Sequence, residues 1–373
     1  MIRVLHVIDH LGLGGAQAAV LDLVRNCDPV QIECEVATMH GRGSFAQAIE
    51  QAGIPVHSLS AKRWPPSYLW SFVKLIQGGR YDILHFHLQG ANWIAKPLAA
   101  ALGYGVRISH DHASGDIRFR GVASLLPDAL AHFASQRIIA VSDGVRDFLT
   151  RWEGICTDRV RVISNGIDTE VFQPANPEDR QRTRKTWGIL GQQFTVGSMG
   201  RLAPEKNFQL LISLAGKLPD VQFLIAGEGP ERPALEALIQ AAEIGDRVRL
   251  LGQVDDRVAF YSALDAFVLP SLYEGLPMAL LEAMAMGLPC VSSDLPDIFS
   301  ALRGGEAGLL CHPDDPQCFV DAISQIAYNK DLAIDFGIAA RGRCLSAFSA
   351  STSAAAIEEI YRSELLFARG QGH

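Results

Sequence analysis

The sequence lacks the marks of a secreted or membrane-spanning protein. Its seven cysteines are odd in number and include no Cys-x-x-Cys pair, so neither a disulfide framework nor a zinc site built on paired cysteines is indicated. The longest apolar stretch, Leu276–Val291, contains Glu282 and two prolines and cannot form a transmembrane helix of about 20 residues. The opening segment Met1–Asp9 is too short for the apolar core of a signal peptide. We therefore expect a cytoplasmic protein with reduced thiols, associated at most with the inner face of the cytoplasmic membrane.

Positive charge is also scarce. The formal net charge is −8, and residues 1–175 carry 16 Lys and Arg against 16 Asp and Glu, so the acidic excess lies in the second half. Binding of nucleic acid through bulk electrostatics is therefore not expected, although a local basic pocket for phosphate is compatible with this balance. The chain has 373 residues, of which 48% are hydrophobic, and this is enough for two domains with separate cores.

Short apolar runs alternate with amphipathic helical patterns along nearly the whole chain. In the first half we expect strands at 3–8, 33–39, 83–86, 106–109, 137–141 and 161–163, and helices at 16–27 and 44–52. In the second half we expect strands at 194–199, 221–226, 247–250, 266–269, 289–292 and 308–310, and helices at 207–218, 232–242, 278–286 and from about 315 onward. This βαβα order predicts parallel sheets covered by helices on both faces.

A polar segment with two prolines, residues 173–180, separates the halves and is interpreted as a linker. We expect an α/β protein with two tandem Rossmann-like, doubly wound domains facing each other across a cleft. The N-terminal domain is predicted at 1–173 and the C-terminal domain at 174–350, followed by a helical tail, 351–373, that can pack back on the first domain. Ligands of such sheets bind beyond the carboxyl ends of the strands.

Both halves begin with a strand, a glycine-rich loop and a helix. This arrangement lets backbone N–H groups approach a phosphate at a helix N-terminus. The first loop carries Gly14 and Gly15, but it is incomplete as a dinucleotide-binding fingerprint because Gln17 occupies the place of the third glycine. A tight turn without a ligand is the alternative interpretation.

The second glycine-rich loop, Gly200–Asn207, carries two cations just before an amphipathic helix. Arg201 and Lys206 can converge on an anion at the start of that helix, or they can be ordinary surface charges. Asn207 is predicted as the N-cap of the helix.

The most informative segment, Leu269–Gly287, joins the end of a strand to an apolar helix. Glu274 lies in the loop, Pro277 is predicted in the first helical turn, and Glu282 lies within the helix. Met, Ala and Leu surround Glu282, so the helix is buried and the carboxylate needs donors, which could be sugar hydroxyls, a backbone group or an arginine. Because Glu274 precedes the helix on the same side of the sheet, the carboxylates of Glu274 and Glu282 could bind the same polar ligand.

Histidines gather at two strand ends in the first half. His85 and His87 lie at the end of one expected strand, and His110 and His112, on either side of Asp111, follow another. Strand ends are places where ligand-facing residues lie. A metal site from these four histidines is conceivable, but each pair is two residues apart and no His-Glu-x-x-His spacing occurs, so structural and catalytic roles both remain open.

In combination these motifs resemble the retaining GT-B glycosyltransferases of family 4, the group 1 glycosyltransferases, over nearly the whole chain. The most specific are the loop Gly200–Asn207 and the spacing from Glu274 to Glu282, which is similar to the Glu-x7-Glu motif of the family. The stretches Asn165–Asp168 and Ala226–Pro230 resemble its Asn-Gly-Ile-Asp and Gly-x-Gly-Pro motifs. The motifs also follow one another in the order expected for the family.

The resemblance implies a metal-free site for the diphosphate of a nucleotide sugar. Gly14 and Gly15 would offer backbone N–H groups to the distal phosphate, and Arg201 and Lys206 would clamp the diphosphate. Family members work without a divalent metal, so neither a metal nor another cofactor is expected. The sequence has no Asp-x-Asp at a strand end that would argue otherwise.

The resemblance also implies contacts with the rest of the donor. Glu282 would hold the ribose hydroxyls and Glu274 the hydroxyls of the donor sugar. His110, or else its neighbours Asp111 and His112, would lie beside the reacting centre, so the implied catalytic residues include His110 with Arg201, Lys206 and Glu274. The remaining implied donor contacts are Val254 near the base and, around the sugar, Gly275, Leu276, Pro277, Met278 and Ala279.

The implied activity is transfer of a sugar from a UDP- or GDP-linked donor to a glycan or to a polyprenyl- or otherwise lipid-linked acceptor, in the biosynthesis of cell-surface polysaccharide or glycolipid. No residue is an obvious nucleophile, so the resemblance implies retention of configuration through front-face attack. Two alternatives stay open: a nucleotide-sugar 2-epimerase of the same architecture and a catalytically silent partner subunit.

Some positions depart from the family pattern or bear on the acceptor. Residues 274–277 read Glu-Gly-Leu-Pro where many relatives have Glu-Gly-Phe-Gly, which leaves the donor sugar open, and residues 294–297 replace the usual Gly-Gly-x-Pro-Glu stretch. Cations mix with aromatic residues at 62–66 and 118–120, which favours an anionic or lipid-linked acceptor at a membrane surface, with solvated loops as the alternative.

Overall fold

The computed structural model divides into two compact units, residues 1–166 with 350–373 (unit 1) and residues 167–349 (unit 2). The described residues are 1–12, 14–59, 65–112, 122–189 and 191–370, with the backbone alone at 65–67 and 122–124. Of the segments 62–66 and 118–120, which were predicted to favour an anionic or lipid-linked acceptor, residues 62–64 and 118–120 lie outside the described residues, and only the backbone is described at 65 and 66.

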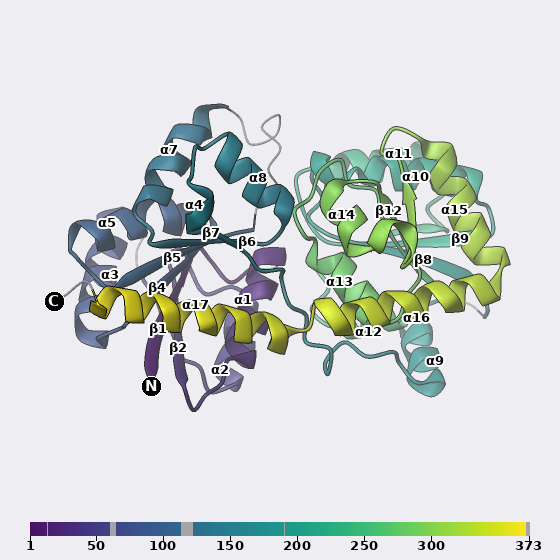
Figure 1. Ribbon diagram of the computed structural model, residues 1–373. Helices are drawn as coiled ribbons and strands as arrows, with labels where there is room; N and C mark the ends of the chain where they lie inside the picture. Colours follow the sequence, from purple (N-terminus) through teal and green to yellow (C-terminus); the bar gives the residue numbers. More distant parts are fainter. Residues whose placement is uncertain (13, 60–64, 113–121, 190, 371–373) are drawn as a thin grey trace. The chain divides into compact units, whose positions relative to one another are not determined.

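Unit 1 is built on a seven-stranded parallel sheet with the order β3-β2-β1-β4-β5-β6-β7 (Figure 1). Its strands are β1 (Ile2–Ile8), β2 (Ile32–Thr38), β3 (Val56–Ser58), β4 (Ile83–His87), β5 (Val106–Asp111), β6 (Arg137–Ala140) and β7 (Val160–Val162). Its helices are α1 (Gly15–Asn26), α2 (Phe45–Gln51), α3 (Pro65–Gly79), α4 (Leu88–Gly90), the π-helical turn η1 (Ala91–Ala95), α5 (Lys96–Ala101), α7 (Val122–Phe133), α8 (Asp143–Arg151), the 3₁₀ turn η2 (Thr157–Arg159) and α17 (Ala350–Gly370).

The alternation of side chains along the central strands gives this sheet two different faces. On β1 and β4, Leu5, Val7, Leu84 and Phe86 point to one face, where they form an apolar core with α3 and α5. The residues between them, histidines among them, point to the opposite face. Helices α1 and α17 pack on each other and lie across that second face (Figure 1).

The C-terminal helix α17 is held to unit 1 by polar contacts as well as by packing. The hydroxyl of Tyr361 lies 2.6 Å from Nδ1 of His85, in the interior of the unit. Glu358 Oε1 accepts a hydrogen bond of 2.7 Å from the backbone N–H of Asp28. The tail of the chain is therefore part of the first unit.

Unit 2 has a six-stranded parallel sheet with the order β10-β9-β8-β11-β12-β13. Its strands are β8 (Phe194–Met199), β9 (Val221–Ala226), β10 (Val248–Gly252), β11 (Ala266–Leu269), β12 (Cys290–Ser293) and β13 (Leu309–Cys311). Its helices are α9 (Pro177–Thr186), the 3₁₀ turn η3 (Pro204–Lys206), α10 (Phe208–Lys217), α11 (Arg232–Ala241), α12 (Arg257–Ser262), α13 (Met278–Ala285), α14 (Pro296–Ala301), the 3₁₀ turn η4 (Arg303–Gly305), α15 (Pro316–Tyr328) and α16 (Lys330–Ala347).

These two sheets confirm the predicted fold class, two tandem Rossmann-like, doubly wound α/β domains. The units divide after Gly166 and after Ser349, whereas the sequence places the divisions after residues 173 and 350. Among the described helices, none has both the length and the hydrophobicity needed to cross a lipid bilayer.

The predicted linker at 173–180 is wrong in its second part, because α9 begins at Pro177. The side chain of Asn176 caps this helix by accepting a hydrogen bond of 2.8 Å from the backbone N–H of Asp179. Asn at the N-cap, Pro at the first helical position and acidic residues in the first turn form a helix-start signal. The same polar composition also resembles a linker, and this is why the helix was missed.

Helix α16 fixes the position of α13, which carries Glu282. Gly337 of α16 lies so close to α13 that a Cβ there would be 2.3 Å from the carbonyl oxygen of Gly287. Arg341 of α16 donates a short hydrogen bond to the carbonyl oxygen of Ala285 at the end of α13. Close packing of these two helices therefore requires glycine at 337.

Two glycines of α16 provide a matched test of this packing. Gly337→Ala should lower the free energy of unfolding by about 1–3 kcal/mol, because the added methyl overlaps the carbonyl of Gly287. Gly342→Ala, in the same helix and with no atom within 4 Å of its Cβ position, should raise it by about 0.5–1 kcal/mol. Urea unfolding measures both, and equal effects of the two variants would contradict the packing described here.

Candidate functional site

Two loops flank the point in unit 2 where the strand order changes direction. β8 and β11 are neighbours in the sheet, and the chain leaves them toward opposite sides, so a crevice forms at their carboxyl ends. The loop after β8 is Gly200–Asn207 and the loop after β11 spans residues 270–277. The backbone N–H of Leu272 donates a hydrogen bond of 2.8 Å to the carbonyl oxygen of Glu205, which ties the two loops together.

An ion pair between Lys206 and Glu274 joins the same two loops. Lys206 Nζ lies 2.5 Å from Glu274 Oε1, and Ser271 Oγ donates to that oxygen at 2.7 Å. The side chains are 20% and 10% exposed, so the pair lies at the edge of the interior, within reach of a polar ligand. The structure thus brings together two residues that the sequence predicted as site residues 68 positions apart. Ser271 was not predicted.

Arg201 does not contact this pair but reaches into solvent. Its guanidinium is 2.6 Å from Glu205 Oε1, and its side chain is 68% exposed. Burial raises the pKa of Glu205, but Arg201 and the backbone outweigh this effect and hold the pKa below its usual value. Exposed ion pairs of this kind contribute little to stability, so an incoming anion can compete for the guanidinium.

The loop after β8 rests on the loop after β9. The backbone N–H of Gly200 donates to the carbonyl oxygen of Ala226 at 3.0 Å, and that of Leu202 donates to the carbonyl oxygen of Glu228 at 2.9 Å. A Cβ at Gly227 would be 1.8 Å from the carbonyl oxygen of Gly200, and its φ is +141°. Glycine is required there by close approach of two backbones, so the Gly-x-Gly-Pro stretch supports the Arg201–Lys206 loop.

Glu282 is buried on α13, at 2% exposure, and is paired within the protein. Its Oε2 accepts a hydrogen bond of 2.9 Å from the Tyr261 hydroxyl, and its Oε1 forms a short ion pair with the guanidinium of Arg257. Burial raises the pKa of Glu282, an effect that Arg257 and Tyr261 oppose. An arginine partner was one of the alternatives left open by the sequence.

Arg257 and Tyr261 are supporting residues that sequence reasoning missed. Both lie on α12, 25 and 21 residues before Glu282, and no local motif connects them to it. The guanidinium of Arg257 also lies 5.2 Å from the centre of the Phe172 ring, a cation–π contact that helps to bury its charge.

The remaining predicted donor contacts lie at the start of α13 and after β10. Leu276, Met278 and Val254 are buried, and Pro277 occupies the N-cap position of α13 and not its first turn as predicted. The backbone at residues 275–279 therefore leads directly into a helix N-terminus, where the dipole favours negative charge. Ala279 accepts a hydrogen bond of 3.1 Å from the Tyr261 hydroxyl at its carbonyl oxygen.

The prediction that Asn207 is the N-cap residue of α10 is confirmed for its position. Asn207 immediately precedes α10, but its side chain makes no capping hydrogen bond, and its φ of +53° places it in the left-handed region. Asn207 is the residue at which the 3₁₀ turn η3 ends and α10 begins, and Asn tolerates the left-handed conformation better than most residues.

The corresponding switch point of unit 1 lies between β1 and β4. Asp9, at the end of β1, accepts hydrogen bonds from the backbone N–H groups of Gly90 at 3.0 Å and Ala91 at 2.6 Å. Gly14 and Gly15 are exposed at the start of α1. The predicted glycine pair thus lies at a solvent-facing helix N-terminus, and Asp9, which was not predicted, joins the two strand ends.

His110 belongs to a buried group of histidines on the α1–α17 face of unit 1. It is only 4% exposed, whereas His112, just beyond the strand, is half-buried. Burial lowers the pKa of His85, His87 and His110 well below the usual value, and that of His112 to about 4. These imidazoles are therefore neutral at neutral pH.

Two sets of three histidines could hold a metal ion. In His6, His85 and His87, and again in His87, His110 and His112, one nitrogen from each ring lies within 4.8 Å of the others. The carboxylates predicted to bind the donor form no such group among the described residues.

Comparison with known proteins gives a glycosyltransferase family model for each half of the chain. Residues 13–171 match the model described as Glycosyltransferase Family 4, and residues 179–343 match that of the glycosyl transferases group 1. The chain is 30% identical over 280 residues to the UDP-Gal:alpha-D-GlcNAc-diphosphoundecaprenol alpha-1,3-galactosyltransferase of Escherichia coli, covering 71% of each protein. It is 32% identical over 250 residues to the alpha-maltose-1-phosphate synthase of Mycolicibacterium smegmatis, covering 61% of this chain and 63% of that protein.

Solved structures with the same fold include HepE of Anabaena in complex with UDP-glucose. That structure superposes with a TM-score of 0.87 at 21% identity, over 97% of this chain and 100% of HepE. The sucrose-phosphate synthase of Thermosynechococcus elongatus gives a TM-score of 0.83 at 21% identity, over 99% of this chain and 100% of that one.

The buried histidines predict how stability depends on pH. Their pKa values are lower in the folded protein than in the unfolded chain. Between pH 6.5 and about 4 the unfolded chain therefore binds protons that the folded chain excludes, and the free energy of unfolding decreases as the pH is lowered. Each histidine should contribute a slope of about 1.4 kcal/mol per pH unit. Urea unfolding from pH 7.5 to 5 with a chelator present measures the slope.

Matched variants assign this slope to the cluster. His110→Asn should make the dependence shallower, whereas His312→Asn, at a residue with a 72% exposed side chain, should leave it unchanged. A stability that does not change between pH 6.5 and 5 in the unmodified protein would contradict burial of neutral histidines.

Proposed function

The chain belongs to the group 1 glycosyltransferases, and from that membership we propose a retaining, metal-independent transfer of a sugar from a nucleoside-diphosphate donor to a glycan or lipid-linked acceptor. The family places the enzyme among glycosyltransferases that use nucleotide sugars. The proposed donor is UDP- or GDP-linked, and the proposed pathway is synthesis of cell-surface polysaccharide or glycolipid. The E. coli relative, whose name specifies a diphosphoundecaprenol-linked acceptor, supports the lipid-linked alternative.

The observation that carries the proposal is the Lys206–Glu274 pair at the switch point of unit 2. A cation and a carboxylate that hold each other at 2.5 Å are preorganised, and both remain accessible. A nucleotide sugar offers each of them a better-matched partner, since the diphosphate is anionic and the sugar hydroxyls donate hydrogen bonds. Lys206 would then contact phosphate, and Glu274, still held by Ser271, would accept from the donor sugar.

Departure of the nucleoside diphosphate concentrates negative charge on the bridging oxygen. In our proposal the Lys206 ammonium and the N–H groups at the start of α13 stabilise this charge, with Arg201 swinging in from solvent. Fixed donors that need no reorganisation during the reaction are the most effective stabilisers of such charge. Lys206, Arg201 and the N-terminus of α13 together can supply the charge stabilisation that a divalent ion supplies in other transferases.

Glu282 is proposed to accept hydrogen bonds from the ribose hydroxyls. Arg257 and Tyr261 each occupy one position on its carboxylate, and two oxygens offer about four lone-pair positions. Burial raises the pKa of Glu282 and Arg257 opposes that rise, which favours the ionised carboxylate, the state that accepts hydrogen bonds from ribose.

Retention is proposed to proceed by attack on the face from which the diphosphate leaves, with the departing phosphate taking the acceptor proton. His110 is proposed to lie beside the donor sugar, and its neutral ring can donate or accept one hydrogen bond there. A covalent glycosyl-enzyme is not part of this route, so trapping one would contradict it.

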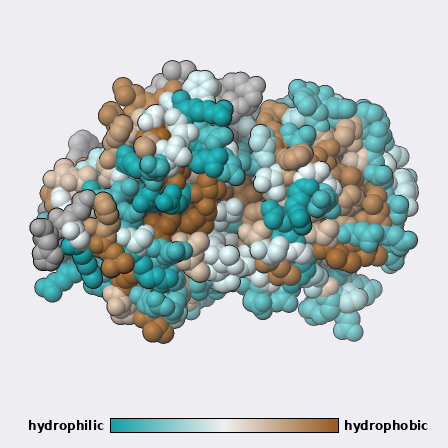
Figure 2. Space-filling model, viewed as in Figure 1, coloured by the Kyte–Doolittle hydropathy of each residue, from teal (hydrophilic) through white to brown (hydrophobic). Residues whose placement is uncertain are grey.

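Unit 1 is proposed to touch the membrane through α7. Leu126, Leu130 and Phe133 are 68%, 61% and 63% exposed and recur at helical spacing along one side of that helix. Figure 2 shows apolar side chains gathered over this part of unit 1. An exposed apolar stripe on a helix is suited to insertion at the boundary between headgroups and acyl chains, where a lipid-linked acceptor is found.

A panel of UDP- and GDP-sugars tests the proposed function. The true donor should raise the melting temperature, and the rise should grow with the logarithm of donor concentration above the Kd. With acceptor and EDTA present, it should give a product with the anomeric configuration of the donor. Inversion, or activity that EDTA abolishes and Mg²⁺ or Mn²⁺ restores, would contradict the mechanism. An epimerised donor formed without acceptor would indicate an isomerase.

Lys206→Ala should lower turnover by about 10²–10³-fold, because one fixed cation is lost from the leaving group. Steady-state kinetics with saturating donor measures it. Lys217→Ala, which removes an exposed lysine at the end of α10, is the matched control and should be unchanged. Equal turnover in both variants would remove Lys206 from the mechanism and revive a non-catalytic role for the chain.

Replacing Leu126, Leu130 and Phe133 together with Ser should abolish flotation with vesicles that contain anionic lipid. The control is Leu366→Ser with Phe367→Ser, which removes exposed apolar side chains from α17 and should leave flotation intact. Failure of the unmodified protein to float would contradict the membrane contact but not the transfer reaction.

A further inference from the structure

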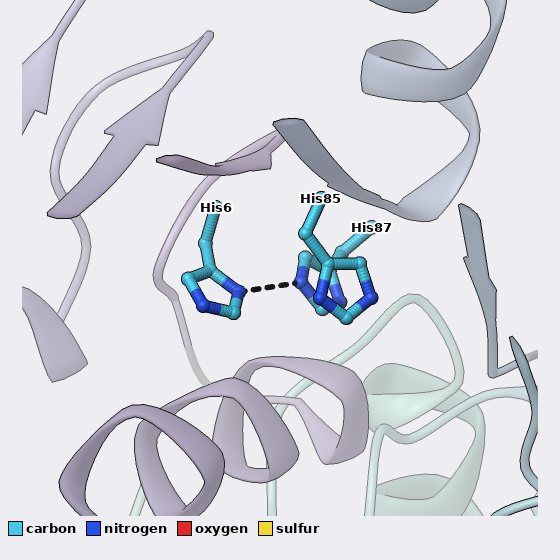
Figure 3. A group of neighbouring side chains, drawn as sticks. All are labelled: His6, His85 and His87. Carbon is cyan, nitrogen blue, oxygen red and sulfur yellow. Dashed lines mark hydrogen bonds between the residues drawn. The ribbon is translucent and has the colours of Figure 1, made fainter. Parts of the chain in front are cut away.

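Three histidines converge on one point inside unit 1. His6 comes from β1, and His85 and His87 come from the neighbouring strand β4, so their side chains share the face covered by α1 and α17. Figure 3 shows the rings pointing toward one another. All three residues are fully buried.

The nitrogens of this cluster are only partly satisfied. His6 Nδ1 lies 3.1 Å from His87 Nε2, which accounts for one hydrogen bond. Among the described residues, His6 Nε2 and His85 Nε2 are buried without a partner. Buried polar atoms are nearly always paired, and each one left unpaired costs free energy. Several such atoms in one cluster suggest a ligand that imidazoles bind.

The spacing of the nitrogens suits a single tetrahedral metal ion. One nitrogen from each ring lies within 4.8 Å of the others. Two nitrogens bound to zinc at about 2.0–2.1 Å lie roughly 3.3 Å apart, close to the separation of the His6 and His87 nitrogens. Small side-chain rotations would complete the geometry. When the ion binds, the proton between His6 Nδ1 and His87 Nε2 would move to the second nitrogen of the ring that carries it, so that both rings stay neutral and each offers a lone pair.

Groups around the cluster orient two of the rings. Tyr361 of α17 lies 2.6 Å from His85 Nδ1, which leaves Nε2 of His85 for a metal. His112 Nε2 lies 3.2 Å from His87 Nδ1, which leaves Nε2 of His87. Ligating histidines almost always use their second nitrogen in this way, and the partner fixes the tautomer.

Two of the rings are in the state that binds metals. Burial lowers the pKa of His85 and His87, so both rings are neutral and offer a lone pair.

We propose that His6, His85 and His87 bind one zinc ion, a structural site that does not depend on the proposed transfer reaction. The second set of three histidines shares only His87 with this one. We favour the first set because its residues are fully buried and two of its rings have orienting partners. The ion would fasten β1 to β4 beneath α17.

Access to this site is restricted. A cavity of about 10 Å³ beside His87, lined by residues of α1 and α17, has room for no more than one water-sized group. Zinc should therefore exchange slowly in the folded protein and enter readily only when α17 opens or during folding.

Metal binding to the full-length protein tests the proposal. After partial unfolding in chelator and refolding, the protein should bind about one Zn²⁺ per chain in competition with a chromophoric chelator, and Co²⁺ should give the visible bands of a tetrahedral site. His85→Asn should weaken Zn²⁺ binding at least about 100-fold. Tyr361→Phe should weaken it roughly 10–100-fold, since it removes only the orienting hydroxyl.

Two controls make the assignment specific. His110→Asn, which changes only the other set of histidines, and His312→Asn, on the surface of unit 2, should both retain binding. The proposal is overturned if the unmodified protein binds no more zinc than a double variant without the imidazoles of His6 and His85. Loss of zinc in His110→Asn with retention in His85→Asn would also overturn it. Circular dichroism verifies that each variant folds. If His85→Asn does not fold, Tyr361→Phe replaces it as the test variant.

Discussion

The ion pair between Lys206 and Glu274 is the contact on which the site of unit 2 depends. A parallel sheet sends successive strands in one direction, so the loops after β8 and β11 meet only because the strand order reverses between them. The pair fixes the geometry of both loops and keeps one cation and one carboxylate at the crevice. A nucleotide sugar can offer phosphate to Lys206 and hydroxyl groups to Glu274 in place of their ion pair. The same two residues therefore stabilise the loops before binding and recognise the donor afterwards.

The carboxylate of Glu282 shows how the surrounding helices support this crevice. An ionised group at 2% exposure is stable only with good partners, and α12 supplies Arg257 and Tyr261. α13, which carries Glu282, is held by α16 through the close approach at Gly337. The site therefore rests on two layers of packing, and its charged groups lie where loops and buried helices meet.

Sequence reasoning predicted the parts of this architecture that have local signals. The alternation of strands and helices gave the two doubly wound units, and the motif from Glu274 to Glu282 gave the polar groups of the loop after β11. Arg257 was missed because its relation to Glu282 exists only after α12 packs on α13. The helix beginning at Pro177 was missed because a capped helix start and a linker share the same polar residues. Likewise, the convergence of histidines from β1 and β4 follows from strand pairing, which their spacing does not reveal.

The most direct measurement is a crystal structure of the full-length protein with its nucleoside diphosphate bound in the absence of divalent metal. The account predicts the diphosphate against Lys206 Nζ and the N-terminus of α13, with the ribose hydroxyls directed at Glu282 and the Lys206–Glu274 distance increased. A diphosphate bound elsewhere, or one that reaches this crevice only through a metal ion, would contradict it.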